Sequence, residues 1–296
     1  MSTSFNQAII EEFRANGGKV GGPFEGGDLL LLTTTGAKSG REHTAPLGYV
    51  RDGDLLLIVG SAGGADRHPA WYHNLLAHPL VQVEIGTDAF EAIAVPAVGA
   101  RRDELFERVV RVVPGYADYQ TQTDRVIPVV MLERSDEGEP PAITNLADKL
   151  LQVHTWLRGQ LDHVHEEAAA YVAARAAHQG GAAPPRPGLG LRLRQHCLAF
   201  CQFLEVHHTG EDSHMFPWLE GRHPHLADTF RRLGEEHRTV SRLQKEIVAL
   251  LADIDAVAPE RFMAELRSLT AELHAHLDFE EKNLIPVLAE IRLPFG

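Results

Sequence analysis

The chain has 296 residues, of which 44% are hydrophobic and 23% are charged. That length suits two domains better than one, and the composition is typical of a protein with buried cores rather than a disordered or membrane-spanning one. The formal net charge of -13 disfavours nucleic acid as a partner, because nucleic-acid binding depends on neutralising phosphates with Lys and Arg. We therefore expect no nucleic-acid partner and no transmembrane segment.

The N-terminal residues and the two cysteines favour a cytoplasmic protein. Residues 1–18 include acidic side chains and have no continuous apolar stretch, so they do not resemble a secretory signal. Cys197 and Cys201 are four residues apart and share one face of a predicted helix rather than forming a Cys-x-x-Cys pair. We expect buried, inert thiols in a reducing compartment.

The first part of the chain, up to about residue 134, has the pattern of short strands. Apolar and β-branched runs bounded by glycine and aspartate predict six strands, at residues 28–35, 44–50, 54–60, 81–86, 90–97 and 126–133. Helices are predicted at residues 5–14, 69–77 and 101–112. Six strands with few helices indicate a small antiparallel barrel rather than a doubly wound parallel sheet.

The pattern changes after this part. Charged residues and prolines predict an interdomain linker at residues 135–144. Beyond it, apolar residues recur three and four apart and predict four helices, at residues 146–177, 189–219, 226–254 and 259–291. The expected organisation is a barrel at residues 1–134, the linker, and an antiparallel four-helix bundle at residues 145–296.

Histidine is distributed unevenly between the two parts. Of 17 histidines, four lie before residue 100 and 13 lie at or after His154. In the second predicted bundle helix His207 and Glu211 are four residues apart, and in the fourth His276 and Glu280 have the same spacing. Residues at this spacing project from one helical face, so each helix can present an imidazole and a carboxylate to the bundle interior.

The first and third bundle helices each add one histidine, His154 and His237. Two carboxylates that bridge two ions, with two imidazoles for each ion, leave a position on each ion for a small molecule. This donor set suits iron or manganese better than calcium. A single histidine of this kind is more often a core or surface residue, but six matching positions on four helices favour a metal centre.

With these motifs, residues 146–291 resemble the hemerythrin HHE cation-binding family. The resemblance implies two iron ions in a non-haem di-iron centre held by His154, His207, Glu211, His237, His276 and Glu280. Respiratory hemerythrins have a second histidine in the third helix, where this chain has Leu233, so simple oxygen carriage is not expected. The other bundle histidines, among them His208, are expected to be exposed or to orient ligands.

The strongest local signal in the first part is a glycine-flanked turn in TTTGAKSGREHTAPL, residues 33–47. Backbone N–H groups, the Ser39 hydroxyl and the cations of Lys38 and Arg41 can together hold a phosphate, although a solvated basic hairpin is an equally frequent alternative. A second glycine turn precedes the helix predicted at residues 69–77, and an open helix N-terminus favours an anion or a carbonyl.

With GxKSG, GG, HPxWYxNL and PGYxxY in this order, the first part resembles the deazaflavin-dependent nitroreductase family, a split-barrel group related to the FMN-binding pyridoxamine oxidase-like fold. The resemblance implies that reduced coenzyme F420, a deazaflavin hydride carrier, binds here; the residues alone leave FMN open. It assigns a phosphate and tail site to Lys38, Ser39, Arg41 and Thr44. It assigns a ring and ribityl site to Pro46, Ser61, Gly63, Gly64, Trp71 and Asn74.

Tyr116 and Tyr119 match the tyrosines that this family places beside the acceptor substrate. The resemblance implies a catalytic role for them, in orienting a carbonyl or donating a proton. An aromatic pair three residues apart in a short helix is core at least as often as catalytic. No nucleophile is expected in this part, because the cofactor carries the hydride.

Together the two parts predict an oxidoreductase in which reduced F420 reduces a quinone or nitro-type acceptor or, through the di-iron site, oxygen. The alternative is a bundle that senses or binds oxygen, nitric oxide or iron and is attached to a cofactor-binding barrel. A purely structural bundle is disfavoured, because burying unpaired histidines and glutamates is costly. We also expect a homodimer through the barrel.

Overall fold

The computed structural model of the chain describes residues 3–135, 143–179, 188–254 and 256–293. Contacts divide the chain into two compact units, which are Met1–Glu137 with Arg186–Ala199, and Gly138–Pro185 with Phe200–Gly296. No helix in the described ranges is long and apolar enough to cross a membrane.

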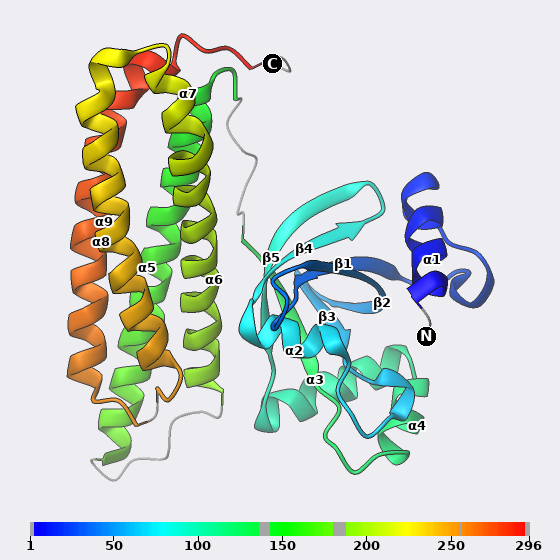
Figure 1. The fold of residues 1–296 in the computed structure, drawn as a ribbon. Coiled ribbons are helices and arrows are strands. Elements are labelled where there is room, and N and C mark those ends of the chain that lie inside the picture. The colour runs from blue at the N-terminus through cyan, green and yellow to red at the C-terminus, as the bar shows by residue number, and fades with distance from the viewer. Residues whose placement is uncertain (1–2, 136–142, 180–187, 255, 294–296) are drawn as a thin grey trace. The chain divides into compact units, whose positions relative to one another are not determined.

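The first unit is built on a closed antiparallel barrel of six strands in the order β1, β2, β3, β6, β5, β4 (Figure 1). The strands are β1 Leu29–Thr35, β2 Glu42–Asp52, β3 Leu55–Val59, β4 Leu80–Ile85, β5 Asp88–Pro96 and β6 Val129–Arg134. The helices of this unit include α1 Thr3–Ala15, α2 Ala70–Ala77, α3 Gly99–Val112 and α4 Gly115–Thr121, with short 3-10 turns at Gly22–Phe24 and Ala62–Gly64. The predicted antiparallel barrel is confirmed.

Strand β1 shows why this barrel needs apolar residues on both of its faces. Side chains alternate along a strand, so Leu30 and Leu32 enter the barrel core whereas Leu29 and Leu31 pack with Phe13 of α1. All four leucines are buried. A strand that is covered on both faces has a continuous apolar run, which is what the four consecutive leucines show.

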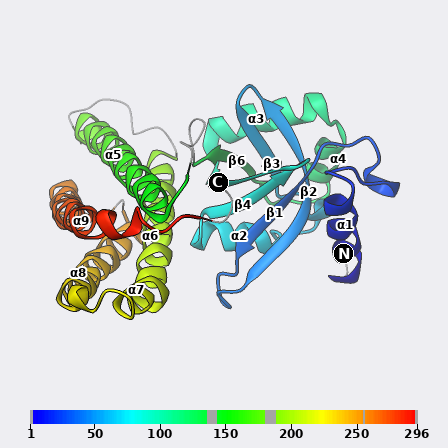
Figure 2. The same cartoon turned by 90° about the horizontal axis from the view of Figure 1, so that it is seen from above.

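Helices α2 and α3 lie on opposite sides of the strands (Figure 2). Trp71 and Leu75 of α2 join the core cluster that contains Leu30, while Leu105 and Val109 of α3 pack in a second cluster on other strand residues. Both faces of the barrel wall are therefore closed by helices. The start of α2 is fixed beside the two glycine turns that the sequence singled out.

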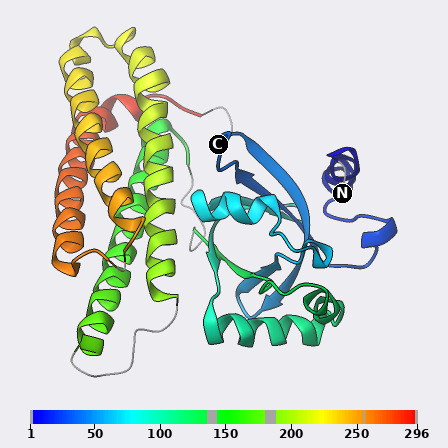
Figure 3. The ribbon, with the colours of Figure 1, turned by 60° about the horizontal axis from the view of Figure 1, so that its bottom comes forward.

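The second unit is an antiparallel four-helix bundle, as predicted, with its long helices running side by side (Figure 3). These helices are α5 Leu146–Gln179, α6 Leu189–Gly210, of which the residues from Phe200 on belong to this unit, α8 Ala227–Leu251 and α9 Pro259–Leu288. A short 3-10 turn, Pro224–Leu226, leads into α8. Helix α9 contacts both α5 and α8, and a view from above places it between them (Figure 2).

Each bundle helix buries one stripe of side chains. In α9 the buried positions from Leu266 to Leu284 follow one another three or four residues apart, except for the adjacent pair His276 and Leu277, the spacing of a helix that packs in a bundle. His276 and Glu280 occupy positions within this stripe, and His237 occupies an equivalent position in the buried stripe of α8. The histidines and the glutamate that could bind a metal thus occupy positions where a bundle normally has leucines.

Helix α6 does not continue to residue 219 as predicted. It ends at Gly210 and is followed by a π-helical segment, Glu211–Met215, and by the short helix α7, Phe216–Glu220. Pro217 has no N–H to donate, but the proline alone does not explain the wider turn, because Pro286 lies at the same distance after Glu280 within the regular helix α9. Such turns are frequent at functional sites, and this one begins at Glu211.

Candidate functional site

Buried histidines and carboxylates form a polar layer across the interior of the bundle. One group consists of His154 from α5, His207 and Glu211 from α6 and the π segment, and Glu280 from α9, with one ligand-type atom of each lying within 4.8 Å of the others. His207 is mostly buried and the other three are buried. Three segments that are distant in sequence, α5, α6 with its π extension, and α9, therefore converge on one small volume.

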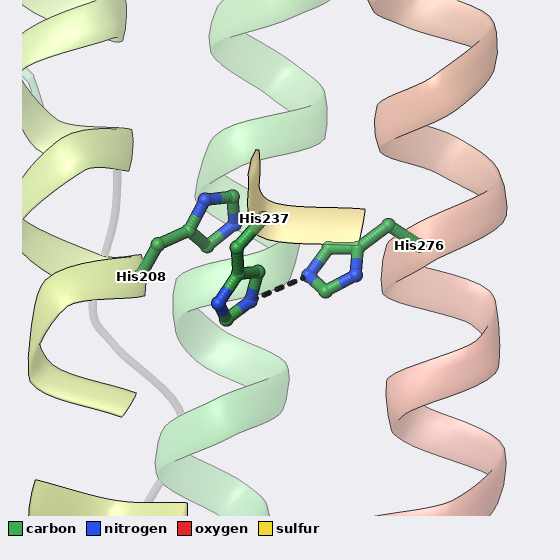
Figure 4. A group of neighbouring side chains, drawn as sticks. All are labelled: His208, His237 and His276. Carbon is green, nitrogen blue, oxygen red and sulfur yellow. Dashed lines mark hydrogen bonds between the residues drawn. The ribbon is translucent and has the colours of Figure 1, made fainter. Parts of the chain in front are cut away.

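A second group lies beside the first and consists of His208, His237 and His276 (Figure 4). The Nε2 atoms of His237 and His276 are 3.2 Å apart. The ring of His208 stacks on that of His237, with centroids 4.0 Å apart and an angle of 15° between the planes. Imidazoles from α6, α8 and α9 are therefore brought together at one point.

Glu211 lies between the two groups. Its Oε1 is 3.2 Å from the Nε2 of His207, and its Oε2 is 3.5 Å from the Nε2 of His237. The position at the first residue of the π segment thus directs one carboxylate oxygen to each group. A carboxylate placed in this way can bridge two metal ions.

Glu280 occupies the corresponding position on the side of α9. Its Oε2 is 3.4 Å from the Nε2 of His154 and 3.6 Å from the Nε2 of His276. The two carboxylates therefore each face one imidazole of either group. This arrangement can hold metal ions, and it brings together all six residues that the sequence predicted as ligands.

The atoms that face the centre of the layer have no hydrogen-bond partner among the described residues. They are the Nε2 atoms of His154, His207 and His208 and both carboxylate oxygens of Glu211 and Glu280. Each buried polar group left in this state costs about 1–3 kcal/mol. Metal cations satisfy imidazole and carboxylate donors together, and this nitrogen and oxygen set suits iron or manganese.

The opposite ring nitrogens are held from outside the layer. Three Nδ1 atoms face carboxylates of neighbouring elements, in the pairs His154 with Glu281 at 2.9 Å, His237 with Asp212 at 2.9 Å and His276 with Glu236 at 3.1 Å. An Nδ1–H that donates to a carboxylate leaves the Nε2 lone pair free for a metal and fixes the ring orientation. The sequence analysis did not identify these three carboxylates.

Burial sets the charge states in the layer. It lowers the pKa of His207 to about 3 and lowers the pKa values of His208 and His276 as well, so these rings are neutral at pH 7 and can donate a lone pair. Burial, together with the charge of Glu280, raises the pKa of Glu211 well above its usual value. A carboxylate binds a metal ion in its deprotonated form, so the raised pKa of Glu211 couples metal binding to the loss of a proton.

His208 is the residue of the layer that the sequence did not place there. The sequence predicted an exposed or ligand-orienting histidine, but the side chain is only 6% exposed and lies with His237 and His276. The sequence feature that could have placed His208 in the layer is its position directly after His207. Adjacent residues of an α-helix are about 100° apart around the axis, so a layer wide enough for two ions can contact both.

A cavity of about 610 Å³ adjoins this part of the layer. It is lined by residues of α6 and α8, among them His208 and His237, and by the charged side chains of Glu205, Arg238 and Lys245. It provides a space next to the second group of histidines through which small molecules can approach.

The barrel brings together the other predicted residues, beginning with the turn between β1 and β2. The backbone N–H of Gly36 donates to the Arg41 carbonyl at 2.8 Å, and that of Gly40 donates to the Gly36 carbonyl at 2.8 Å. Lys38, Ser39 and Arg41 are exposed on this turn. Neither cation forms an ion pair with any residue that the structure describes, so both remain available to an anion.

Asn74 of α2 fastens this turn. Its Oδ1 accepts a hydrogen bond from the backbone N–H of Ala37 at 3.1 Å, and its Nδ2 donates to Thr34 Oγ1 at 3.1 Å. Thr44 Oγ1 lies 2.8 Å from Thr33 Oγ1 across the β1–β2 pair. Two of the predicted cofactor residues, Asn74 and Thr44, therefore shape the turn in this structure.

The second glycine turn has a constrained backbone. Ala62, Gly63 and Gly64 have φ values of 50°, 63° and 81°, a left-handed run that is costly for residues other than glycine. A Cβ atom at Gly64 would lie 2.6 Å from a side-chain oxygen of Gln122. Glycine is thus required there by both conformation and space.

Arg125 holds the same turn and was not predicted. Its Nε donates to the Ala65 carbonyl at 2.7 Å, and its Nη2 donates to the carbonyl of Ser61, one of the predicted residues. Its Nη1 lies 3.1 Å from His68 Nδ1. A long-range contact from residue 125 therefore fixes the loop that leads into α2, and no local pattern in the sequence signals it.

The remaining predicted residues of the barrel differ in exposure. Trp71 is 8% exposed and packs in the barrel core, and Pro46 lies opposite Leu31 in the β1–β2 pair. Tyr116 is half-buried and Tyr119 is exposed, with ring centroids 6.2 Å apart. Burial raises the pKa of Tyr116, so its phenol keeps its proton at neutral pH.

The first unit has the features of a cofactor-binding domain, namely a closed barrel with two glycine turns. The second has those of a metal-binding domain, namely a bundle with a buried layer of imidazoles and carboxylates. Comparison with known families agrees with both. Residues 7–134 match the family model described as F420H(2)-dependent quinone reductase, and residues 145–288 match the model described as Hemerythrin HHE cation binding domain.

Curated relatives match the first of these segments. The F420H(2)-dependent quinone reductases Rv1261c and MT1299 of two Mycobacterium tuberculosis strains, H37Rv and CDC 1551, are each 41% identical over 128 residues, covering 41% of this chain and 85% of the relative. The solved structure of F420-H2 dependent reductase FDR-A is 40% identical and covers 36% of this chain and 94% of that one, with a TM-score of 0.34. The chain belongs to the F420H(2)-dependent quinone reductase family and carries a hemerythrin HHE domain after the family segment. The expected resemblances are confirmed, and the family is one of F420-dependent oxidoreductases.

Replacing Asp212 with Asn should weaken metal binding by the bundle about tenfold, because mutations of such outer carboxylates typically cost 10–100-fold in affinity. Asp212 holds the Nδ1 of His237 at 2.9 Å. Anaerobic titration of metal-free protein with Fe(II) measures the change. Glu235→Gln is the matched control, because Glu235 is exposed and pairs only with Arg231 among the interactions described. Equal affinities for the two variants would contradict the assignment.

In metal-free protein the stability of the bundle should be greatest near neutral pH. Below about pH 6.5 the unfolded chain binds more protons than the folded one, because burial lowers the pKa values of three histidines, His207, His208 and His276, against one raised carboxyl, so stability rises with pH. Above that pH the raised pKa of Glu211 acts in the opposite direction: the stability that its protonated form contributes is lost as pH rises toward that pKa, by at most about 1.4 kcal/mol per pH unit.

Urea unfolding of chelator-treated protein between pH 6.5 and 8.5, followed by far-UV circular dichroism, measures this decline. Glu211→Gln should abolish it, because the amide does not titrate. A decline of the same slope in this variant would show that another group is responsible.

Proposed function

We propose that this chain is an F420H2-dependent quinone reductase whose bundle holds a di-iron centre. Family membership of residues 7–134 is the observation that carries the first half of the proposal. The unsatisfied donor layer, with a carboxylate oxygen directed to each histidine group, carries the second half. The domain assignment follows, with the reductase at residues 1–134 and the metal-binding bundle at residues 145–296.

When bound, reduced F420 supplies a hydride and a proton, which convert a quinone to a hydroquinone. The residues of this chain have to bind the cofactor, place it and exclude competing reactions. Lys38 and Arg41 stand on the exposed turn without an ion-pair partner among the described residues, and such cations suit the phosphate and the acidic tail of F420. Asn74 keeps this turn in place through Ala37.

Tyr116 is the residue we assign to the acceptor. Its raised pKa keeps the phenol protonated, so its hydroxyl can donate a hydrogen bond or a proton to a quinone oxygen. A Cβ atom at Gly48 would lie 3.4 Å from this hydroxyl, so the glycine leaves room next to it. Tyr119, exposed and edge-on to Tyr116, is proposed to shield the same place.

Replacing both Lys38 and Arg41 with Ala should weaken binding of F420H2 to the full-length protein by at least about tenfold, because each charge-assisted hydrogen bond that is lost is worth about 1.5–3 kcal/mol. The loss should shrink at high salt, since exposed charges are screened. A fluorescence titration measures both effects. Lys19→Ala, which removes another exposed cation of this unit, is the control. Unchanged affinity in the double variant would contradict the proposed site.

A second candidate reaction is the reduction of oxygen through the metal centre. The geometry of the layer favours it, because two ions that share carboxylates can exchange two electrons, as many as one hydride carries. Simultaneous replacement of His207 and Glu211 by Ala should abolish oxygen consumption driven by F420H2 and leave quinone reduction unchanged. Quinone reduction in the same sample shows that the barrel is folded. An intact oxygen rate would rule out the coupling and leave the quinone reductase assignment in place.

Three further expectations stay predictions. A cytoplasmic location and the absence of a nucleic-acid partner rest on the sequence and its charge of -13, and a homodimer through the barrel rests on the family resemblance. The alternative role of the bundle, in sensing or storing oxygen, nitric oxide or iron, predicts a metal-loaded protein that turns over quinone but not oxygen. The oxygen-consumption experiment separates these two roles.

A further inference from the structure

The two donor groups of the bundle are unequal in their imidazoles. The group of His154 and His207 contains two, and the group of His237 and His276 contains a third, from His208. The two carboxylates lie between the groups and are shared. The difference between the two sides therefore depends on what His208 does.

Helix α8 does not provide this third imidazole. Its buried stripe has Leu233 one turn before His237, and this leucine is fully buried in a cluster with Phe216 and Phe230. A second donor for this side of the layer must come from another helix. His208 of α6 is the imidazole that reaches the same point.

The contacts of His208 are those expected of a metal ligand rather than of a packed core residue. Its Nε2 is buried and has no hydrogen-bond partner among the described residues. Its ring is stacked on His237 at 4.0 Å and lies edge-on to His276 at 5.1 Å between centroids, as Figure 4 shows. A buried nitrogen without a partner costs about 1–3 kcal/mol, and an ion shared with the two other rings removes that cost.

The neighbouring residue explains how one helix serves both sides. His207 directs its Nε2 toward Glu211 Oε1 at 3.2 Å, in the first group. His208 is displaced from it by about 100° around the helix axis and belongs to the second group. The doublet therefore spans the layer, with one ring for each ion.

We propose that His208 is a direct metal ligand and gives the ion held by His237 and His276 a third imidazole, so that the two metal positions are chemically different. This inference rests on the proposed function, that the bundle binds two ions. With the carboxylates shared, the ion at His154 and His207 has one protein ligand fewer. That ion would therefore have one more coordination position that the protein leaves open.

Iron binding to the full-length protein tests the role of His208 without using activity. Anaerobic Fe(II) titration and Mössbauer spectroscopy of the 57Fe-loaded protein report affinity, stoichiometry and the environment of each ion. The wild-type protein should bind two ions in two distinguishable environments. His208→Phe keeps an aromatic ring to stack on His237 but has no ligand atom. It should lower the iron affinity of one metal position by at least about tenfold, because replacing a residue that only orients a ligand already costs 10–100-fold. It should also abolish one of the two iron environments.

His214→Phe is the matched control, because His214 is an exposed histidine of the adjacent π segment, and it should behave as wild type. His208→Gln provides a second variant that removes the imidazole without enlarging the side chain, and it should show the same loss. Two ions with wild-type affinity and spectrum in either His208 variant would overturn the proposal and leave His208 as a packing residue. A wild-type protein that binds no stoichiometric metal would instead overturn the proposed function.

Discussion

The bundle depends on satisfying a layer of polar atoms that lies where a four-helix core is normally apolar. Five imidazoles and two carboxylates face one another in this layer, and burial makes each unpaired atom costly. Carboxylates outside the layer satisfy three of the rings at Nδ1. A metal ion would accept lone pairs from the inner atoms and remove this cost, so metal binding should stabilise the fold of this unit.

The outer carboxylates follow a rule that is visible in the sequence once the structure is known. Each of them is the chain neighbour of a residue of the layer, in the doublets Glu211–Asp212, Glu236–His237 and Glu280–Glu281. One member points inward and the other, about 100° around the axis, reaches the histidine of an adjacent helix. The angular offset between neighbouring residues, which places His207 and His208 on two sides of the layer, therefore also places the carboxylates that hold the rings from outside.

Much of this architecture could be predicted from local patterns. Spacings of three and four gave the bundle helices, and the pairs His207 with Glu211 and His276 with Glu280 gave four of the predicted ligands. His208 could not be found in this way, because a helical period assigns only one narrow face to the interior and says nothing about the width of the layer. The π segment at Glu211 also escaped prediction, because the matching stretch from Glu280 to Pro286 has the same spacing and stays α-helical in α9.

The barrel shows the same division between local and tertiary information. Alternation and bounding glycines predicted its strands, but β2 is longer than expected because pairing with β1 extends from Gly48 to Glu42. The contacts of Asn74 with the β1–β2 turn and of Arg125 with the second glycine turn join residues about 40 and 60 positions apart. Sequence periodicity contains no information about such pairs, although they decide the shape of the proposed cofactor site.

Each proposed site is complete within its own unit. The barrel residues assigned to F420 and its acceptor come from β1, β2, α2, α4 and the turns between them, whereas every member of the metal layer comes from α5, α6, α8, α9 and the π segment. Neither site borrows a side chain from the other. A replacement in the metal layer therefore leaves every side chain of the proposed cofactor site in place, and the reverse also holds.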